Sequence, residues 1–222
     1  MFPIQDETRR PSRAPIVTVA IIGLNAAVFV LELIGGDAFV NQWSAVPAEI
    51  VAGRHLATIL TSMFMHGSWS HIIGNMIFLW AFGPEIEDAM NPARYLLFYL
   101  LGGVVATLAQ TLVDPTSTIP TLGASGAIAA VMGAFLVTYP RDKIRTLVFF
   151  GLFFRLTFIP AALLIGFWLV IQLVSFGAVT DAQSGGVAYA AHIGGIAFGA
   201  LTCRLFEDRR RIARRNRTFG ET

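Results

Sequence analysis

Charged residues are scarce in this chain. Asp, Glu, Lys and Arg make up 14% of its 222 residues, whereas hydrophobic residues make up 55%. A soluble domain normally carries about a quarter charged residues, so the composition argues against an ordinary soluble protein. The apolar residues also come in runs close to the length of about 20 that crosses a bilayer. We therefore expect a polytopic helical membrane protein with no room for a separate soluble domain.

Cysteine is nearly absent, and the net charge is only +2. The single Cys203 excludes an internal disulfide and gives no thiol-metal signature. The small net charge gives little support for nucleic acid as a partner, because the basic residues cluster where membrane topology explains them. The first apolar run, 16–34, is too long for a signal-peptide core and lacks an obvious cleavage site, so we expect a retained span.

Six apolar segments predict a compact, all-α bundle of six transmembrane helices. The spans cover about residues 16–34, 63–82, 95–113, 122–139, 160–176 and 187–206. Glycine or proline is expected to end three of them, at 35–37, 83–84 and 140. The predicted organisation is a cytoplasmic N-terminal segment at 1–15, a membrane domain at 16–206 and a basic cytoplasmic tail at 207–222.

The connecting segments carry further expectations. Short amphipathic pieces between the first two spans are interpreted as an interfacial loop, with an ordinary packed loop as the alternative. An acidic loop containing Glu85, Glu87 and Asp88 is expected after the second span. The apolar stretch before Pro160 contains Arg155, so we place it at the membrane interface.

The basic residues predict the orientation, because Lys and Arg in short loops mark the cytoplasmic side. With six spans, one side receives Arg9, Arg10, Arg13, Arg94, Arg141, Lys143, Arg145 and the arginines of 209–217, and the other side receives only Arg54. Both termini are therefore expected to be cytoplasmic. The same topology places one layer of polar residues toward the extracytoplasmic side: His66, His71, Asn75, Ser125 and His192.

Ser125 and His192 are the candidate catalytic pair. A serine beside a histidine base is the minimal activated nucleophile. No span offers an obvious acid to complete a triad, so we predict a dyad. The alternatives are a small-residue packing role for Ser125 and a hydrogen bond to a backbone carbonyl for His192. Gly195 and Gly199 share the helix face of His192, which indicates close helix packing.

His71 and Asn75 are four residues apart and share one helix face. Asn75 suits a fixed amide donor that stabilises an oxyanion, and interhelical hydrogen bonding is the alternative. A zinc site at His66 and His71 is weakly supported, because no carboxylate or thiolate accompanies them. Other buried polar residues are interpreted as interhelical hydrogen-bonding groups only, namely Asn25, Gln110 and Gln172.

Three segments together resemble the rhomboid intramembrane serine proteases. They are HGSWSHIIGN at 66–75, GASG at 123–126 and AHIGG at 191–195, and the match extends from about residue 60 to 206. The resemblance implies a water-filled active site that opens outward, with Ser125 as nucleophile and His192 as general base. It also implies an oxyanion held by Asn75, His71 and the Ser125 backbone amide.

The resemblance assigns supporting roles as well. His66 would brace the loop between the first two spans, Glu87 would match a glutamate that holds helix ends together, and Gly126 belongs to the serine motif. Two features depart from the family pattern. A Trp-Arg pair ahead of the second span is replaced by Ala57 and Thr58, and an aromatic four residues after the serine is replaced by Ala129, which leaves the support of the histidine open.

The predicted function is that of an intramembrane serine endopeptidase that cleaves single-pass or other transmembrane proteins within or next to their membrane segment. No metal or organic cofactor and no nucleic acid are expected, and the partners are the substrates and the lipid bilayer. The prokaryotic plasma (inner) membrane is the expected location, with substrate entering sideways past the fifth span. The alternative is an inactive relative that binds transmembrane clients. A histidine-relay transporter is little supported, because no broken helix pair or repeat is present.

Overall fold

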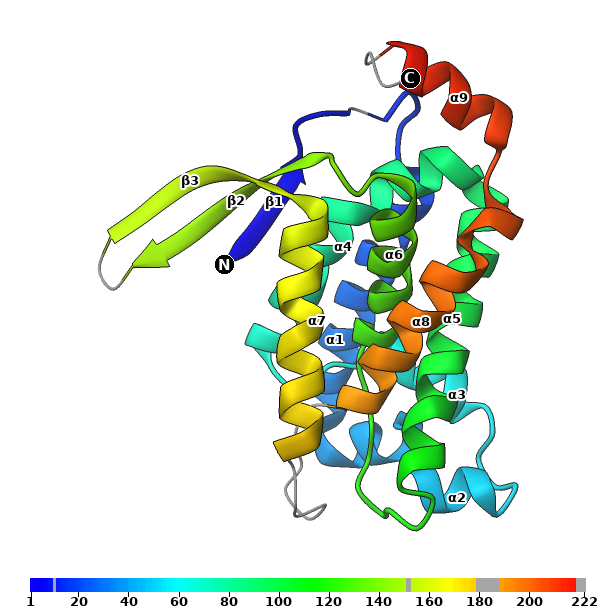
Figure 1. The fold of residues 1–222 in the computed structure, drawn as a ribbon. Coiled ribbons are helices and arrows are strands. Elements are labelled where there is room, and N and C mark those ends of the chain that lie inside the picture. Colours follow the sequence, from blue (N-terminus) through cyan, green and yellow to red (C-terminus); the bar gives the residue numbers. More distant parts are fainter. Residues whose placement is uncertain (10, 151–152, 179–187, 219–222) are drawn as a thin grey trace.

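The structure is a computed structural model that describes residues 1–9, 11–150, 153–178 and 188–218, and it is dominated by helices (Figure 1). The six longer helices of the bundle are α1 (Ile16–Trp43), α4 (Trp69–Met90), α5 (Pro92–Val113), α6 (Ser125–Thr138), α7 (Ala161–Ala178) and α8 (Tyr189–Phe206). Shorter pieces are α2 (Pro47–Val51), α3 (Thr58–Thr61), the 3-10 turn η1 (Ser62–Phe64) and α9 (Arg209–Thr218).

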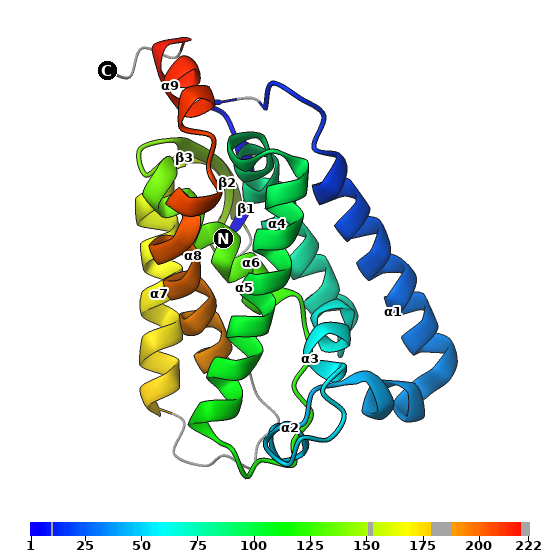
Figure 2. The ribbon, with the colours of Figure 1, turned by 90° about the vertical axis from the view of Figure 1, so that its right-hand side faces the viewer.

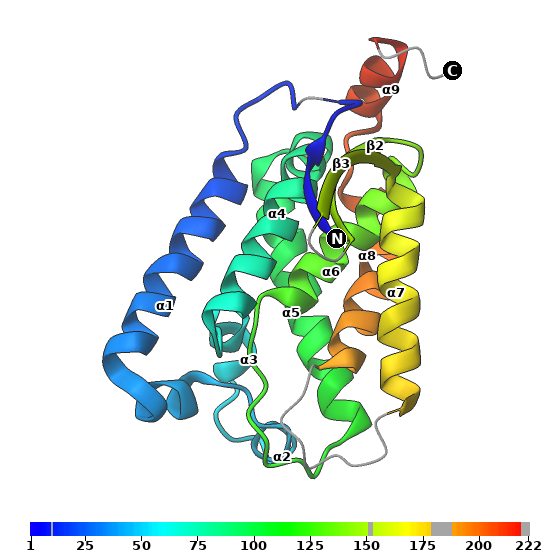
Figure 3. The same cartoon turned by 90° about the vertical axis from the view of Figure 1, so that its left-hand side faces the viewer.

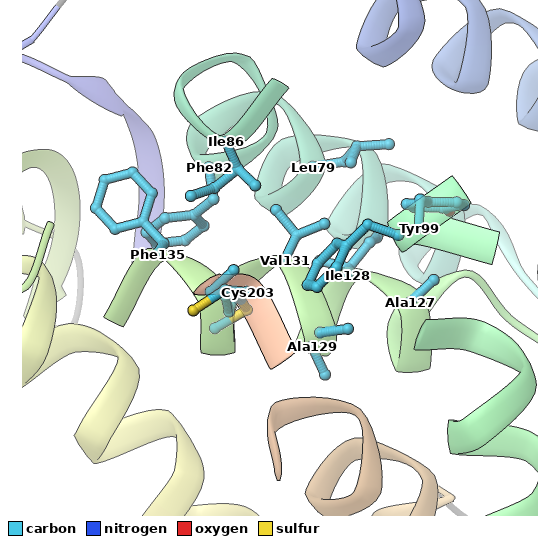
Figure 4. Packing of buried hydrophobic residues seen from close by; sticks show 14 of the residues in the cluster. Leu79, Phe82, Ile86, Tyr99, Ala127, Ile128, Ala129, Val131, Phe135 and Cys203 are labelled. Atoms are coloured by element: carbon cyan, nitrogen blue, oxygen red, sulfur yellow. The ribbon is translucent and has the colours of Figure 1, made fainter. Parts of the chain in front are cut away.

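Helix α6 forms the centre of the bundle and packs against α4, α5, α7 and α8. It has no polar face, and every residue from Gly126 to Phe135 is buried. Figure 4 shows Ile128 and Val131 of α6 lying against Leu79 and Phe82 of α4 in the shared core. A helix that is apolar all round is stable only when it is surrounded, so the composition of α6 places it at the middle.

Glycines bring α6 and α8 into backbone contact. A Cβ atom at Gly195 would collide with the carbonyl oxygen of Gly126, and one at Gly199 would collide with that of Ala130. Small residues allow this approach in membrane helix pairs, as expected from the sequence. The close pairing matters for the polar layer, because Ser125 begins α6 and His192 lies in the first turn of α8.

Helix α1 lies at the edge of the bundle, beside α4 (Figure 2). The helix is interrupted at Gly36, within the predicted end at 35–37, and the chain then resumes a helical course to Trp43. Gly36 has φ 59° and ψ −156°, a conformation that is open to glycine and interrupts a regular helix. The first helical segment of α1 therefore ends at the predicted glycine pair, and a second segment follows the kink.

Helix α4 also runs further than predicted, through Pro84 to Met90. The expected acidic loop is therefore wrong: Glu85, Glu87 and Asp88 are buried residues of the last turns of α4. Proline removes one helical hydrogen bond and usually ends or kinks a helix. Here the last turns are held by other bonds, because Glu87 and Asp88 bind the chain that leads into α1.

A three-stranded antiparallel sheet lies at the end of the bundle that carries both termini (Figure 3). Its strands are β1 (Phe2–Asp6), β2 (Lys143–Phe150) and β3 (Phe153–Pro160), in the order β1-β2-β3. The prediction of an all-α fold was therefore wrong for these segments. The stretch is rich in β-branched and aromatic residues, which favour strands, and β1 packs against α4 while β3 leads into α7.

Buried charges join β1 to the turn before β2. Arg9 Nε lies 2.6 Å from Asp142 Oδ2, and the Arg9 guanidinium stacks 4.6 Å from the centre of the Tyr139 ring. Asp6 accepts hydrogen bonds from the backbone amides of Thr8 and Arg9. Burial, followed by a hydrogen bond with Asp142 and the negative charge of that residue, raises the pKa of Asp6 to about 8. The two carboxyl groups therefore share a proton near neutral pH.

Among the described residues, two helices are long and apolar enough to cross a membrane by length and composition, α1 and α5. Helices α6 and α7 are apolar but contribute shorter apolar segments. The arrangement is consistent with a membrane helical bundle, and the count of six spans and the orientation of the termini stay predictions.

Candidate active site

Ser125 and His192 meet between α6 and α8. Ser125 Oγ lies 2.7 Å from His192 Nε2, although the two residues are 67 positions apart in the chain. His192 is 6% exposed. Gly123, with φ 130°, turns the chain into α6 so that Ser125 is the first residue of the helix. The amide of a first helical residue has no acceptor within its own helix, so it is available for another group.

The second ring nitrogen of His192 is bonded to a residue of α7. His192 Nδ1 lies 2.7 Å from Gln172 Oε1, and Gln172 is itself buried. An amide oxygen only accepts, so the imidazole proton belongs on Nδ1 and the Nε2 lone pair faces Ser125. Sequence reasoning interpreted Gln172 only as an interhelical hydrogen-bonding group and did not connect it with the histidine.

Trp168 lies one helical turn before Gln172 and also contacts the histidine. The centres of the Trp168 and His192 rings are 5.2 Å apart, with an angle of 44° between the ring planes. A four-residue spacing on α7 points both side chains at α8. That spacing of an aromatic and an amide, in an otherwise apolar helix, was the available sequence signal.

His71 lies close to Ser125, with Gly123 between them. A Cβ atom placed on Gly123 would lie 2.8 Å from His71 Nε2 and 3.6 Å from Ser125 Oγ, so the two side chains flank this glycine. No larger residue would fit there without moving the His71 ring. The structure therefore brings His71, Ser125 and His192 together from three different helices.

Asn75 reaches the site through His66. Asn75 Nδ2 lies 2.9 Å from His66 Nε2, and the His66 and His71 rings are 5.1 Å apart in an edge-to-face arrangement. The His66 backbone amide donates to both carboxylate oxygens of Glu32 in α1, at 3.0 Å each. Glu32, which the sequence analysis did not assign to the site, therefore fixes the loop that carries His66.

A small cavity adjoins Ser125 on the side of α5. Its volume is about 20 Å³, enough for about one water molecule. It is lined by Ser125 and Gly126, by Thr107 of α5, and by Thr121 and Ala188 of the flanking segments. Polar hydroxyls and backbone groups at its wall can hold a water within reach of the serine.

Within the described ranges, no group of three or more His, Cys, Asp or Glu side chains is placed to hold a metal ion. The polar cluster consists of one hydroxyl, three imidazoles and two amides, joined in pairs by hydrogen bonds and ring contacts. Such a cluster can transfer a proton from the serine and donate hydrogen bonds to an oxyanion.

Residues 53–208 match the family model of the rhomboid domain, which is more than half of the chain. The chain belongs to the rhomboid family. Among curated rhomboids, it is 30% identical over 142 residues to the rhomboid protease GluP of Bacillus subtilis, covering 60% of this chain and 27% of that protein.

Two other relatives show similar levels of identity. The chain is 27% identical over 139 residues to the rhomboid protease GlpG of Yersinia pestis, covering 63% of this chain and 49% of that protein. It is 28% identical over 135 residues to Rhomboid protein 1, mitochondrial, of Saccharomyces cerevisiae, covering 59% and 38%. The matched regions are thus less than half the length of each of these relatives.

The structure describes the residues at which the sequence was expected to depart from the family pattern, Ala57, Thr58 and Ala129. Ala129 is fully buried in α6, and the aromatic contact to His192 comes from Trp168 of α7. Thr58 begins α3, and its hydroxyl donates to the His55 carbonyl at 2.7 Å. Arg54, one turn earlier, is exposed.

Glu87 lies at the opposite end of the rhomboid domain from the serine. Its carboxylate accepts hydrogen bonds from the backbone amides of Val17 and Thr18, at 2.9 and 2.8 Å, and from the Thr18 hydroxyl at 2.8 Å. The first amides of a helix lack intrahelical acceptors and carry partial positive charge, so a carboxylate there is stabilising. Glu87 thereby joins the start of α1 to the end of α4.

Proposed function

We propose that this chain is an intramembrane serine endopeptidase in which Ser125 is the nucleophile and His192 is the general base. The observation that carries the proposal is the 2.7 Å hydrogen bond between Ser125 Oγ and His192 Nε2. A hydroxyl becomes a competent nucleophile when an adjacent base accepts its proton as it attacks. Family membership and the similarity to named rhomboid proteases support the same reaction class.

In the proposed reaction, Ser125 Oγ attacks the carbonyl carbon of a substrate peptide while its proton moves to His192 Nε2. His71, the Asn75 amide and the Ser125 backbone amide would donate to the negative oxygen that forms. His192 then returns the proton to the departing amine, and an acyl-enzyme remains. The Asn75 amide nitrogen carries two N–H groups. One of them donates to His66 Nε2, so the other remains free to donate to the oxyanion.

Hydrolysis of the acyl-enzyme needs water in a bundle whose surroundings are apolar. Non-helical backbone and water are tolerated at membrane depth only where protein encloses them. The cavity beside Ser125 is of the size of about one water, which would be activated by His192 in the second half-reaction. No metal or organic cofactor takes part in the proposed steps.

The proposed substrates are transmembrane proteins, cleaved within or next to their membrane segment. A peptide carbonyl within a helix is hydrogen-bonded, so local unwinding must precede attack. Helix-breaking residues lower that barrier, since glycine costs about 1 kcal/mol and proline about 3 kcal/mol in a helix interior. We further propose that the protein lies in a bacterial cell membrane, with both termini cytoplasmic and the serine toward the extracytoplasmic side, because the basic residues cluster near the termini.

The test combines a fluorophosphonate probe with cleavage of a model single-span substrate by the purified protein. Wild type should label and cleave, whereas Ser125→Ala and His192→Ala should do neither. Ser70→Ala is the matched control, because Ser70 is an exposed serine bonded only at the start of α4. A folded wild type that neither labels nor cleaves in detergent or liposomes would favour the client-binding alternative, and cleavage by Ser125→Ala would exclude this nucleophile.

A further inference from the structure

We propose that Gln172 and Trp168 of α7 position the catalytic histidine, so that His192 is a competent base only while α7 is seated against α8. The inference rests on the proposed function of Ser125 and His192. It adds a residue to each side of the imidazole: an amide that fixes its proton and an indole that fixes its plane. Both come from one helix that contributes neither nucleophile nor base.

The amide determines the tautomer. A neutral imidazole donates from one nitrogen and accepts at the other, and a base facing Ser125 needs its lone pair on Nε2. Gln172 Oε1, 2.7 Å from Nδ1, accepts the hydrogen of that tautomer and of no other. The same bond strengthens when His192 becomes an imidazolium, because charged donors form shorter and stronger hydrogen bonds.

The indole limits ring rotation and favours the charged state. At 5.2 Å between ring centres, Trp168 covers His192 on the side toward α7. An imidazolium within about 6 Å of an aromatic centre gains cation–π stabilisation. Ala129, on the neighbouring turn of α6, has only a methyl group and provides no such surface, so α7 supplies the aromatic contact.

Gln172 is an exception on its own helix. The side chains of α7 are mostly apolar, and several of them are exposed, including Leu163 at 66%, Val170 at 55% and Val174 at 66%, whereas Gln172 is 6% exposed. A buried amide on an apolar helix is unfavourable unless it is hydrogen-bonded, so this contact also holds α7 against α8. Any displacement of α7 that admits a substrate would separate Gln172 and Trp168 from His192 together. Catalysis would then resume when the helix returns.

The charged and titratable groups around His192 are few in the described part of the chain. Ser125 faces Nε2, Gln172 faces Nδ1, and His71 of α4 is the titratable side chain that acts on it electrostatically. Asp181, the acidic residue that follows α7 in the chain, lies outside the described residues. Replacing Gln172 therefore changes a neutral partner of the imidazole while the other named contacts stay in place.

The experiment measures kcat, KM and the pH profile of cleavage for Gln172→Leu, Gln172→Glu and Trp168→Leu. Gln172→Leu should lower kcat about 10- to 100-fold, because a hydrogen bond to a charged group is lost in the transition state. Its KM should stay within about twofold, since the amide contacts the base and not the substrate. Trp168→Leu should show a smaller loss of kcat, and Trp168→Phe should recover most of it.

Gln172→Glu separates positioning from packing. A carboxylate at this place can still accept from Nδ1 and stabilises the imidazolium, so activity should exceed that of Gln172→Leu and the acid limb of the pH profile should move to higher pH. Two controls match these changes. Gln110→Ala removes a partly buried amide beside α8, 3.4 Å from the Ala191 amide, and Phe167→Leu alters the exposed neighbour of Trp168; both should retain the wild-type acid limb.

The outcomes are distinct from those that test the nucleophile. If wild type requires Ser125 but Gln172→Leu keeps the wild-type kcat, the positioning role is wrong and the protease assignment stands. An acid limb unchanged in Gln172→Glu overturns the role in the same way, even if the leucine variant does not fold. If cleavage does not depend on Ser125, the proposed function itself fails, whatever the Gln172 variants do.

Discussion

The two ends of the bundle are held together by different chemistry. Around Ser125 most side-chain contacts are between neutral groups, including His192 with Gln172 and His66 with Asn75, and the Glu32 carboxylate bound to the His66 amide is the exception. At the end that carries the termini, buried carboxylates bind backbone amides and arginines, as in the Arg9–Asp142 pair. Glu87 binds the start of α1 there, Asp88 binds Ser12 in the chain before α1, and Arg211 of α9 binds Asp88.

The difference indicates how rigidity is distributed. Charge-assisted hydrogen bonds are about twice as strong as neutral ones, and breaking a buried one leaves an uncompensated charge. The terminal end should therefore open rarely. Apart from the Glu32 contact, the end with Ser125 uses weaker neutral bonds that can be exchanged for substrate and water. With a rigid terminal end and weaker contacts around Ser125, α7 can move against a fixed framework. The following variants test this difference in rigidity.

The largest expected effect is a loss of activity without a loss of stability. Ser125→Ala should lower kcat by about 10³-fold or more, because removing one member of a nucleophile–base pair removes most of the catalysis. Its free energy of unfolding should change by less than about 1.5 kcal/mol, since only one hydrogen bond is lost. Cleavage assays and detergent-titrated unfolding measure the two quantities. A collapse of stability would show that the serine end is the rigid one.

Glu87→Ala should have the reverse effect. Removing the carboxylate leaves the Val17 and Thr18 amides unpaired at the start of α1, and we expect a loss of about 3 kcal/mol in the free energy of unfolding. The kcat of the folded fraction should stay near that of wild type. Glu49→Ala is the control, because Glu49 is partly exposed and paired with an exposed His55, so its removal should change stability by less than about 1 kcal/mol.

Gly199→Ala should affect both properties moderately. The added methyl would collide with the Ala130 carbonyl and push α8 from α6, which we expect to cost about 2 kcal/mol. The kcat should fall as well, because the two helices carry His192 and Ser125. Gly166→Ala is the matched control: a Cβ there meets nothing within 4 Å, so stability should be unchanged or higher by about 0.5–1 kcal/mol. Equal effects of the two substitutions would contradict the close helix contact.

The last prediction concerns the pH dependence of stability at the terminal end. Because the pKa of Asp6 is raised to about 8 in the folded state from 3.8, the folded protein retains a proton that the unfolded chain releases. The contribution of Asp6 to the free energy of unfolding should therefore be largest below about pH 4. It should decline as the pH rises to about 8, by at most about 1.4 kcal/mol per pH unit. Asp6→Asn should flatten this decline in unfolding titrations, while Asp37→Asn, in the bend of α1, should not.

Sequence reasoning identified the helices better than their ends. Apolar runs predicted each of the longer helices, because hydropathy is a local property. It could not show that α4 continues past Pro84, since the bonds that hold those turns come from the chain before α1. The sheet was missed for two reasons. β1 pairs with β2 across more than a hundred residues, and the adjacent strands β2 and β3 form an apolar stretch that was interpreted as an interfacial segment.

The candidate site was also predicted only in part from the sequence. Motif spacing selected Ser125, His192, His71 and Asn75, and the structure brings the first three into one cluster and links Asn75 to it through His66. Gln172 was grouped with the other buried amides, because a glutamine in an apolar helix has the same appearance whichever group it faces. The roles of all these residues stay predictions until the variants are measured.

The sequence by itself determined the class of protein, the apolar helices and the residues with chemistry to offer. Low charge and long apolar runs leave a chain few ways to fold other than as a helical bundle. The tertiary structure decided which polar groups meet. Asn25 bonds the carbonyl of Ile21 in its own helix, Gln110 reaches the Ala191 amide, and Gln172 binds the candidate base. Hydrogen bonds between helices depend on rotation and depth of packing, which no single helix encodes.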